Sequence, residues 1–419
     1  MERNVTLDFV RGVAILGILL LNISAFGLPK AAYLNPAWSG SASLSDAWTW
    51  ALLDLLAQVK FLTLFALLFG AGLQLLLPRG KRWIQSRLTL LALLGFIHGL
   101  FFWDGDILLA YALVGLVSWR MVREAHHVKS LFNTGVVLYL TGIAVLVLLG
   151  LISGTAANRS WAPDAANLQY EQYWKLHGGM EAVSNRADML SDNLLAPDAA
   201  NLQYEQYWKL HGGMEAVSNR ADMLSDNLLA LGAQYGWQLA GMMLMGAALM
   251  RSGWLKGQFS LRHYRRTGAL LVAAGMAVNL PAIFAQWYLA WDYRWCAFLL
   301  QAPRELSAPL QAIGYAALAW GYWPQLCRFR LVGAIACVGR MALTNYLLQT
   351  LICTTLFYHL GLFMRFDRLQ LLAFVPPIWA VNLLVSSLWL RRFRQGPVEW
   401  LWRQLTLRAS GTSLKDTSR

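Results

Sequence analysis

Residues 7–22 read LDFVRGVAILGILLLN, an apolar run interrupted by one acid, one base and one amide. About 20 such residues are needed to cross a bilayer as a helix. The run has no small-residue cleavage site and carries two charges, which a signal peptide would not combine in this way. It is therefore interpreted as the first membrane helix.

The rest of the chain has the composition of a membrane protein. It is 57% hydrophobic and 14% charged, whereas soluble proteins carry about 25% charged residues. Mean hydropathy is +0.43, and the 20 Trp suit membrane interfaces. The four cysteines show no metal-type spacing and no disulfide framework.

Hydropathy predicts an all-α fold, a polytopic transmembrane helical bundle of about ten spans. The predicted spans are 8–27, 56–77, 88–103, 106–121, 132–153, 234–251, 267–287, 307–324, 332–358 and 369–390. They divide the chain into four parts: a five-helix membrane half at 1–154, an outer loop at 155–233, a second five-helix half at 234–391 and a tail at 392–419.

The basic charge of the chain follows the predicted topology. A net charge of +13 would indicate nucleic-acid binding in a soluble protein. Here lysines and arginines gather in alternate connecting segments and in the tail, while the short outer loops hold few of them. This positive-inside pattern predicts a bacterial inner-membrane protein with both termini in the cytoplasm, surrounded by lipid and without a nucleic-acid partner.

Two segments outside the spans stand out. Trp400, Leu401, Trp402 and Leu405 alternate with charges, which predicts an amphipathic interfacial helix in the cytoplasmic tail. Residues 162–195 recur identically at 196–229, a tandem repeat of 34 residues in the outer loop. Two identical copies without a repeat-family pattern indicate a recent duplication rather than a solenoid.

Ionisable groups inside a membrane are costly, so each is a functional candidate. In the first span Asp8 and Arg11 are three residues apart and can pair. Arg11 and Asn22 share a face roughly 16 Å apart along the axis. The pair either anchors the helix end or binds a ligand. Lys60, predicted near the outer end of the second span, either snorkels to the interface or joins a site.

The third and fourth spans are joined by GFIHGLFFWDGDILLAYALVGL, residues 95–116. His98 is predicted near mid-membrane, with Asp104 and Asp106 in a tight turn beyond it. A histidine oriented by a carboxylate can act as a general base. The alternative is a histidine that only packs and bonds to a backbone carbonyl. With two acids close by, we favour a catalytic role for this group, without a metal.

The ninth span contains VGRMALTNYLLQT, residues 338–350. Arg340 is predicted near mid-membrane without a charge partner in its own span, so it needs an anionic partner or ligand. Thr344 shares its face, and Asn345 and Gln349 form a second polar pair that could bond to neighbouring helices. Together with the first-span residues and Lys60, these groups predict ligand-binding positions along a cavity that crosses the bilayer.

Five stretches carry a resemblance to a known family: LDFVRGVAILGILLLN, KFLTLFALLFGAG, HGLFFWDGDILLAYALVGL, GRMALTNYLLQT and GPVEWLWR. In this order they resemble the domain-of-unknown-function 418 family. Together the five stretches extend over nearly all of the membrane portion. The duplicated loop departs from the family pattern.

A more distant resemblance is to transmembrane acyltransferases, which move an acyl group from cytoplasmic acyl-CoA to an outer-face sugar. Their first helix carries Arg, ten residues and then His. Arg11 matches that Arg, but Asn22 stands where the His would be, as it does in heparan-glucosaminide acetyltransferases. The resemblance therefore implies acyl transfer only if His98 is the base, with Asn22 as an oxyanion donor.

Two functions remain open from the residues. One is a membrane-bound acyltransferase with acyl-CoA as donor and an outer-face small molecule or glycan as acceptor. The alternative is a small-solute transporter, since two halves of five spans each would have inverted topology. A structural membrane protein without chemistry fits the intramembrane charges less well. Substrate and oligomeric state do not follow from the sequence.

Overall fold

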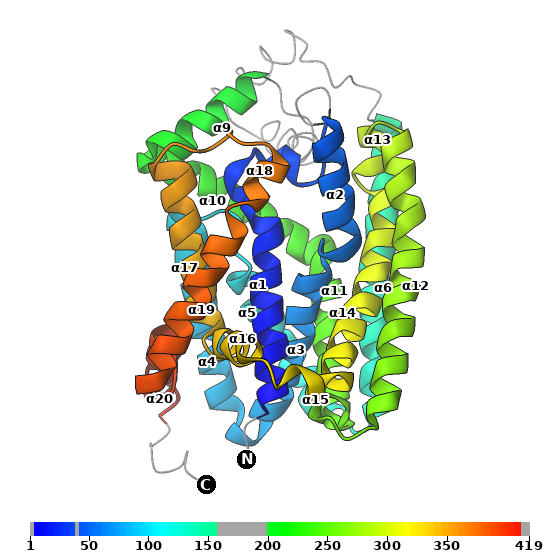
Figure 1. Cartoon of the computed structure of the whole chain (residues 1–419), viewed down its shortest axis with the longest axis vertical. Helices are drawn as coiled ribbons and strands as arrows, with labels where there is room; N and C mark the ends of the chain where they lie inside the picture. Colours follow the sequence, from blue (N-terminus) through cyan, green and yellow to red (C-terminus); the bar gives the residue numbers. More distant parts are fainter. Residues whose placement is uncertain (1–3, 38–41, 157–198, 412–419) are drawn as a thin grey trace.

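The computed structural model describes residues 4–37, 42–156 and 199–411. These residues form an all-helical bundle with no strand among them, so the predicted fold class is confirmed (Figure 1). The N-terminal end of α1 and helix α20 lie toward the same end of the bundle, where the labels mark the chain termini.

The helices follow one another in the order of the predicted spans, with several additions. Their bounds are α1 (Val5–Gly27), α2 (Leu44–Leu56), α3 (Lys60–Leu76), α4 (Lys81–Phe101), α5 (Leu108–Glu124), α6 (Val128–Ala156), α9 (Ala199–His211), α10 (Gly213–Ala230), α11 (Gly236–Arg251), α12 (Leu261–Tyr288), α13 (Tyr293–Cys296), α14 (Ala302–Gly321), α15 (Trp323–Leu326), α16 (Arg330–Arg340), α17 (Ala342–Thr354), α18 (Arg368–Leu372), α19 (Val375–Arg392) and α20 (Pro397–Ser410).

The predicted count of ten spans is too high. In the described part of the chain, six helical stretches are long and apolar enough to cross a membrane, or seven if the bent pair α16–α17 is one span. Helices α5 and α11 are short, with 17 and 16 residues. Helix α14 has 20 residues but carries Arg304, Glu305 and Gln311, which lower its hydropathy.

The second predicted span is longer than expected and broken. Helix α2 precedes α3, and the two are separated at Ala57–Val59, where Val59 has a φ of 65°. Lys60 begins α3 and is fully buried, so of the two alternatives for this residue snorkelling to the interface does not fit the structure. Its ammonium donates to the Asp54 carbonyl at 2.6 Å and so caps the end of α2. The break is stabilised by a buried cation.

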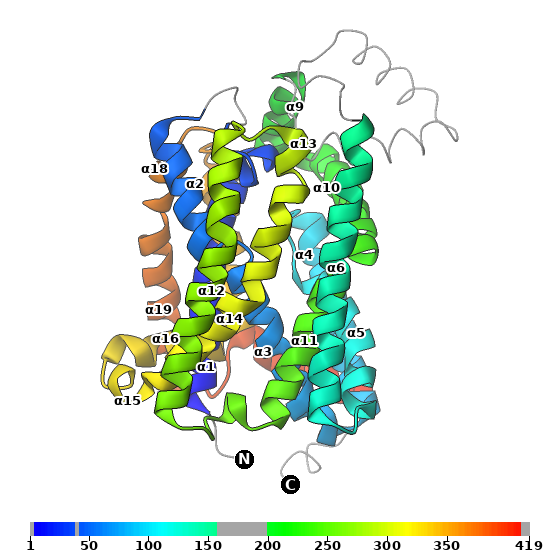
Figure 2. The same ribbon diagram turned by 90° about the vertical axis from the view of Figure 1, so that its right-hand side faces the viewer.

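The outer segment between the two halves is partly helical. The first copy of the repeat lies outside the described residues, but the second forms α9 and α10. Asn227 of α10 donates to the Asp104 carbonyl at 3.3 Å, and Arg220 donates to the Phe101 carbonyl at 3.3 Å. These helices therefore cover the turn between α4 and α5, as Figure 2 shows from the side.

The ninth predicted span is bent by 90° between α16 and α17. Figure 1 shows α16 in the lower part of the bundle, near α15 and α20. Arg340, the last residue of α16, therefore lies toward that end rather than at mid-membrane, which corrects the expectation from hydropathy. Hydropathy averages over the bend and cannot detect it.

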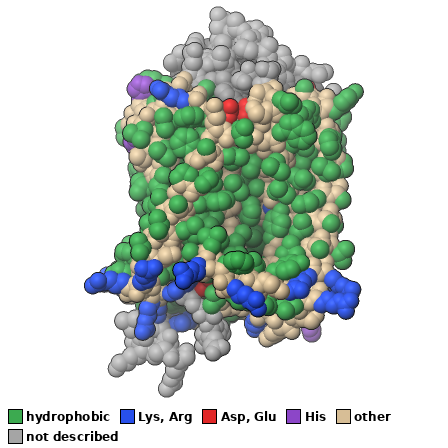
Figure 3. All heavy atoms as spheres, viewed as in Figure 1, with side chains coloured by type: hydrophobic (Ala, Val, Ile, Leu, Met, Phe, Trp, Pro, Cys, Tyr) green, Lys and Arg blue, Asp and Glu red, His purple; other side chains and the backbone are tan. Residues whose placement is uncertain are grey.

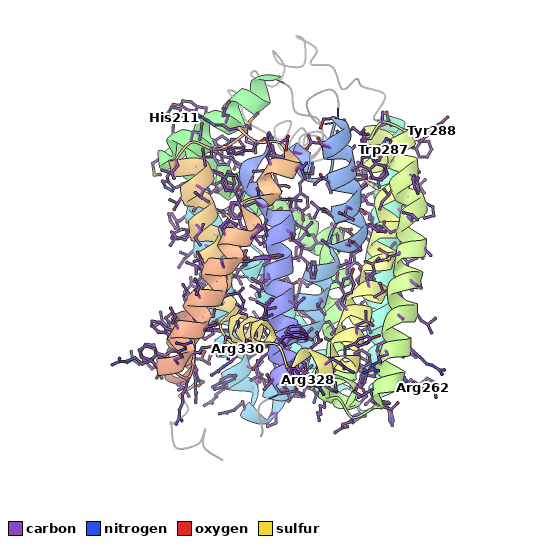
Figure 4. All side chains as sticks on the ribbon, viewed as in Figure 1. His211, Arg262, Trp287, Tyr288, Arg328 and Arg330 are labelled. Atoms are coloured by element: carbon purple, nitrogen blue, oxygen red, sulfur yellow. The ribbon has the colours of Figure 1, made fainter. Side chains whose placement is uncertain are left out.

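The two ends of the bundle differ in charge. Lysine and arginine side chains gather around one end of the visible face, below a broad hydrophobic belt (Figure 3). Arg262, Arg328 and Arg330 lie at this basic end, whereas His211 and Tyr288 lie at the opposite end (Figure 4). The belt includes strongly exposed Leu270 and Leu384, consistent with a lipid environment.

Helices α3 and α11 cross at very short range. A Cβ on Gly70 would lie 1.9 Å from the Met243 carbonyl oxygen, and one on Gly246 would lie 1.9 Å from the Leu67 carbonyl oxygen. Small residues at such crossings let two membrane helices approach closely. Gly72, two residues along α3, has no heavy atom within 4 Å of an added Cβ, so of these two α3 glycines Gly70 serves the contact and Gly72 does not.

We expect Gly70→Val to destabilise the folded bundle by about 3 kcal/mol, because α3 and α11 must separate to admit the side chain. Gly72→Val is the matched control and should change stability little, since its space is open. Thermal unfolding of both purified variants in detergent measures the difference. Equal midpoints for the two variants would show that the crossing is not close-packed in solution.

Candidate functional site

The predicted histidine and one of the two predicted aspartates form a close pair. His98 lies in the last turn of α4, and Asp106 directly precedes α5 after a short turn. The His98 Nδ1 and Asp106 Oδ1 atoms are 2.7 Å apart, and both side chains are almost completely buried, at 3% and 1% exposure. The chain returns on itself here, which brings base and acid together.

The surroundings of Asp106 favour one tautomer of His98, that is, one of its two ring nitrogens as the site of the proton. Asp106 Oδ2 accepts the Leu109 backbone N–H at 2.8 Å, in the first turn of α5. A helix N-terminus favours a carboxylate anion. An ionised Asp106 can only accept from the imidazole, so Nδ1 carries the proton and Nε2 keeps its lone pair.

The free side of the imidazole meets α17. His98 Nε2 is 3.1 Å from Thr350 Oγ1, a hydroxyl that is itself buried. The ring of Tyr346, one turn earlier on α17, lies 5.3 Å from the imidazole between centroids. The sequence analysis missed both residues, although their spacing of four places them on one helix face.

Asp104 does not share the role of Asp106. One of its carboxylate oxygens, Oδ1, is buried and without a hydrogen bond in the described structure. Asp104 faces the cap formed by α9 and α10, where Lys209 pairs with Glu205 at 2.8 Å. Burial lowers the pKa of Lys209, but the interactions with Glu205, which also accepts a hydrogen bond, and with Tyr358 and Asp104 outweigh it and raise that pKa. The cap thus holds a firmly charged cation near Asp104.

A cavity of ≈ 350 Å³ approaches this group from the basic end. Arg11, Arg87 and Arg340 line it together with Glu399 and Trp402. At its other end lie Ile107, Tyr111 and Tyr346, next to the His98 group. Most of the wall between is apolar and includes Ile15, Phe65, Leu68, Phe69, Leu73, Leu76, Leu88, Leu91 and Leu343.

The three arginines come from three helices. Arg11 pairs with Asp8 at 3.3 Å, as predicted. Arg340 donates to the Arg394 carbonyl at 3.1 Å, while its Nε is buried without a partner in the described residues. Arg87 stacks 3.4 Å from the Trp402 ring of α20. The mouth of the cavity is therefore strongly basic.

Close contact between α1 and α16 positions two of these arginines. A Cβ on Gly339 would lie 1.8 Å from the Asp8 carbonyl oxygen, so only glycine allows this approach. Arg340 follows Gly339 directly, and Arg11 lies one turn from Asp8. The crossing therefore brings two cations to one cavity, against their mutual repulsion.

The remaining predicted ligand residues point elsewhere. Asn345 donates to Ser386 Oγ at 2.8 Å and accepts from Asn382 at 2.8 Å, and Gln349 donates to Asn382 at 3.3 Å. These amides join α17 to α19, as the sequence suggested for neighbouring helices. Thr344 binds the Glu399 carboxylate through its N–H at 3.0 Å and through its hydroxyl.

Asn22 is half-buried in α1, and no hydrogen bond in the described structure joins it to His98 or to Asp106. Its predicted role as an oxyanion donor therefore gains no support from the geometry. The predicted crossing cavity is also shorter than expected, because the cavity that starts at Arg11 ends at Tyr346.

A second buried polar cluster surrounds the break between α2 and α3. Asp54 accepts from Arg304 at 3.0 Å and from Asn279 at 2.7 Å, and its carbonyl binds Lys60. Asp54 and Arg304 are 1% and 2% exposed. Asp54 and Arg304 both lie just outside the predicted spans 56–77 and 307–324. Their separation of 250 residues left no local signal.

The chain is 72% identical to the uncharacterized protein YeiB of Escherichia coli strain K12, over 419 residues and all of both chains. A family model described as a protein of unknown function (DUF418) matches residues 249–409. The chain belongs to the DUF418 family. With several apolar spanning helices, this makes it a bacterial membrane protein.

Other relatives in Bacillus are more distant. The uncharacterized protein YxaH of Bacillus subtilis strain 168 is 29% identical over 97% of this chain and 94% of its own length. An uncharacterized 39.9 kDa protein of Bacillus acidopullulyticus is 27% identical over the same shares. No solved structure matches the chain. The DUF418 match includes Arg340, Tyr346 and Thr350, but it begins at residue 249 and so does not include His98 and Asp106.

Proposed function

We propose that this DUF418 protein transfers an acyl group from a cytoplasmic acyl-CoA to an acceptor at the outer face of the inner membrane. One observation carries the proposal. An apolar cavity connects three arginines at the basic end with Tyr346, whose ring lies against the His98–Asp106 pair. An anionic donor with an apolar tail fits such a site.

The proposal assigns the basic end to the cytoplasm. Lys and Arg gather there, and cytoplasmic segments of membrane proteins carry such an excess (Figure 3). The N-terminal end of α1 and helix α20 lie at that end, so both termini would be cytoplasmic. The helices α9 and α10 would then cover the outer side of the site.

The distances suit a long anionic donor. Arg87 and His98 both lie on α4, eleven residues apart, and so are separated by about 16 Å along its axis. Arg11, Arg87 and Arg340 would bind the phosphates of CoA, since guanidinium groups recognise phosphate well. The pantetheine arm and acyl chain would occupy the apolar wall. His98 would accept a proton from the attacking hydroxyl or amine.

The test is acyl transfer from radiolabelled CoA thioesters in membranes that contain the protein. We expect Gly72→Leu to reduce transfer at least tenfold, because Gly72 lines the cavity and the new side chain enters open space. Gly333→Leu, on the exposed side of α16, is the matched control and should transfer normally. Equal activity of the two variants, or none in the unmodified protein, would refute the proposal.

Transport of a small solute remains the second candidate, and the buried cluster around Asp54 favours it. Broken helices and intramembrane charges often mark transport sites. Uptake into cells that is lost in Lys60→Met but retained in His98→Ala would support transport. Acyl transfer lost in His98→Ala but retained in Lys60→Met would support the enzyme.

A further inference from the structure

Three buried side chains form a continuous line at the closed end of the cavity. Asp106 lies 2.7 Å from His98 Nδ1, and His98 Nε2 lies 3.1 Å from Thr350 Oγ1. They come from three separate parts of the chain: the turn before α5, α4 and α17. A hydroxyl, a base and a group that orients the base are the parts of an activated nucleophile.

The hydrogen-bond directions favour this arrangement. Asp106 Oδ2 accepts the Leu109 N–H at the start of α5, and a carboxylate at that position favours the tautomer in which Nδ1 donates to Asp106 and Nε2 accepts. The Thr350 hydroxyl can then donate to Nε2, at 3.1 Å. Its other neighbour, the Tyr346 carbonyl, is farther away at 3.3 Å. Proton loss from Thr350 to His98 therefore follows an existing hydrogen bond.

The position of Thr350 relative to the cavity also fits. Leu343 and Tyr346 of α17 line the cavity, and Thr350 lies one turn beyond Tyr346 on the same face. The Tyr346 hydroxyl is held by one long hydrogen bond, 3.3 Å from the Ile107 N–H. Tyr346 thus separates the cavity from Thr350, and a change of its side-chain rotamer would join the two.

We propose that Thr350 is a nucleophile that carries the acyl group as an ester between donor and acceptor. The inference rests on the proposed acyltransferase function and specifies its chemistry. Thr350 Oγ1 attacks the thioester carbonyl while His98 takes the hydroxyl proton. The carbon–sulfur bond breaks, and the CoA thiolate receives that proton from His98. An acceptor hydroxyl or amine then attacks the ester, with His98 as base, and the proton returns to Thr350.

The test uses purified full-length protein in detergent and octanoyl-CoA with a terminal alkyne as probe, without acceptor. We expect the protein to release about one CoA per chain and to retain a hydroxylamine-sensitive label. Peptide mass spectrometry should place the label on Thr350. Thr350→Val should lose release, label and transfer to background, whereas Thr350→Ser should retain all three.

Thr354→Val is the matched control, because Thr354 is a buried threonine one turn later that bonds to the Thr350 carbonyl and not to His98. It should behave like the unmodified protein. Transfer by Thr350→Val within threefold of normal, or a label on another residue, would overturn the inference while leaving the acyltransferase intact. Failure of the unmodified protein to transfer at all would overturn both.

Discussion

His98→Ala should reduce acyl transfer by about 10²–10⁴-fold, the usual contribution of a positioned general base. His98 is the side chain through which both Asp106 and Thr350 act, so no neighbour can replace it. Asp106→Asn should have a comparable effect, because an amide can donate to Nδ1 and reverse the imidazole tautomer. Transfer from labelled CoA thioesters by membranes with equal amounts of each variant measures both effects.

Two controls make this result specific. Asp104→Asn removes the neighbouring carboxylate, which makes no contact with His98 in the described structure, and should lower transfer far less than Asp106→Asn. His263→Ala removes an exposed histidine of α12 and should have no effect. Similar losses for the two aspartate variants would show that the turn, rather than the His98–Asp106 hydrogen bond, is required.

Arg304→Ala should destabilise the folded protein by about 3–5 kcal/mol. The substitution removes the cation that pairs directly with the buried Asp54 carboxylate, and breaking a buried ion pair by removing one partner is costly. Asn279 would still donate to Asp54 and Lys60 would still bind its carbonyl, but neither replaces the direct ion pair with the carboxylate. Thermal unfolding in detergent and the amount of protein in membranes are the measurements.

A double substitution that removes both charges distinguishes the cost of leaving Asp54 unpaired from the cost of losing the ion pair. Asp54→Asn combined with Arg304→Gln removes both charges of the ion pair and should be less destabilising than Arg304→Ala alone, because neither member of the pair is left as an unpaired charge. Arg262→Ala, an exposed position at the basic end, should stay within about 0.5 kcal/mol of the unmodified protein. A double variant as unstable as the single one would refute the argument from charge.

Much of the fold follows from hydropathy, because each span must satisfy its own backbone within the membrane. The α1 helix, the order of the spans and the tail helix α20 were predicted from sequence alone. The break before Lys60 and the bend after Arg340 were not. Both depend on tertiary contacts, such as the bond from Lys60 to the Asp54 carbonyl, that local hydropathy does not contain.

The candidate site, like the fold, was predictable from the sequence only in its local part. His98 and Asp106 are eight residues apart across one turn, so their meeting could be inferred. Thr350 lies 252 residues from His98, and nothing in its own helix distinguishes its hydroxyl from those that bond to the preceding turn. Arg11, Arg87 and Arg340 meet only because three helices converge, which no local pattern encodes.

The exact repeat in the outer segment limits what the loss of one copy can change in the protein. Because residues 162–195 and 196–229 are identical, loss of either unit from the gene produces one and the same shorter chain. In that chain the remaining unit still lies immediately before Ala230, so Lys209, Arg220 and Asn227 keep their distance in sequence from α11. The number of copies can therefore change without any change in the residues that form the cap over Asp104.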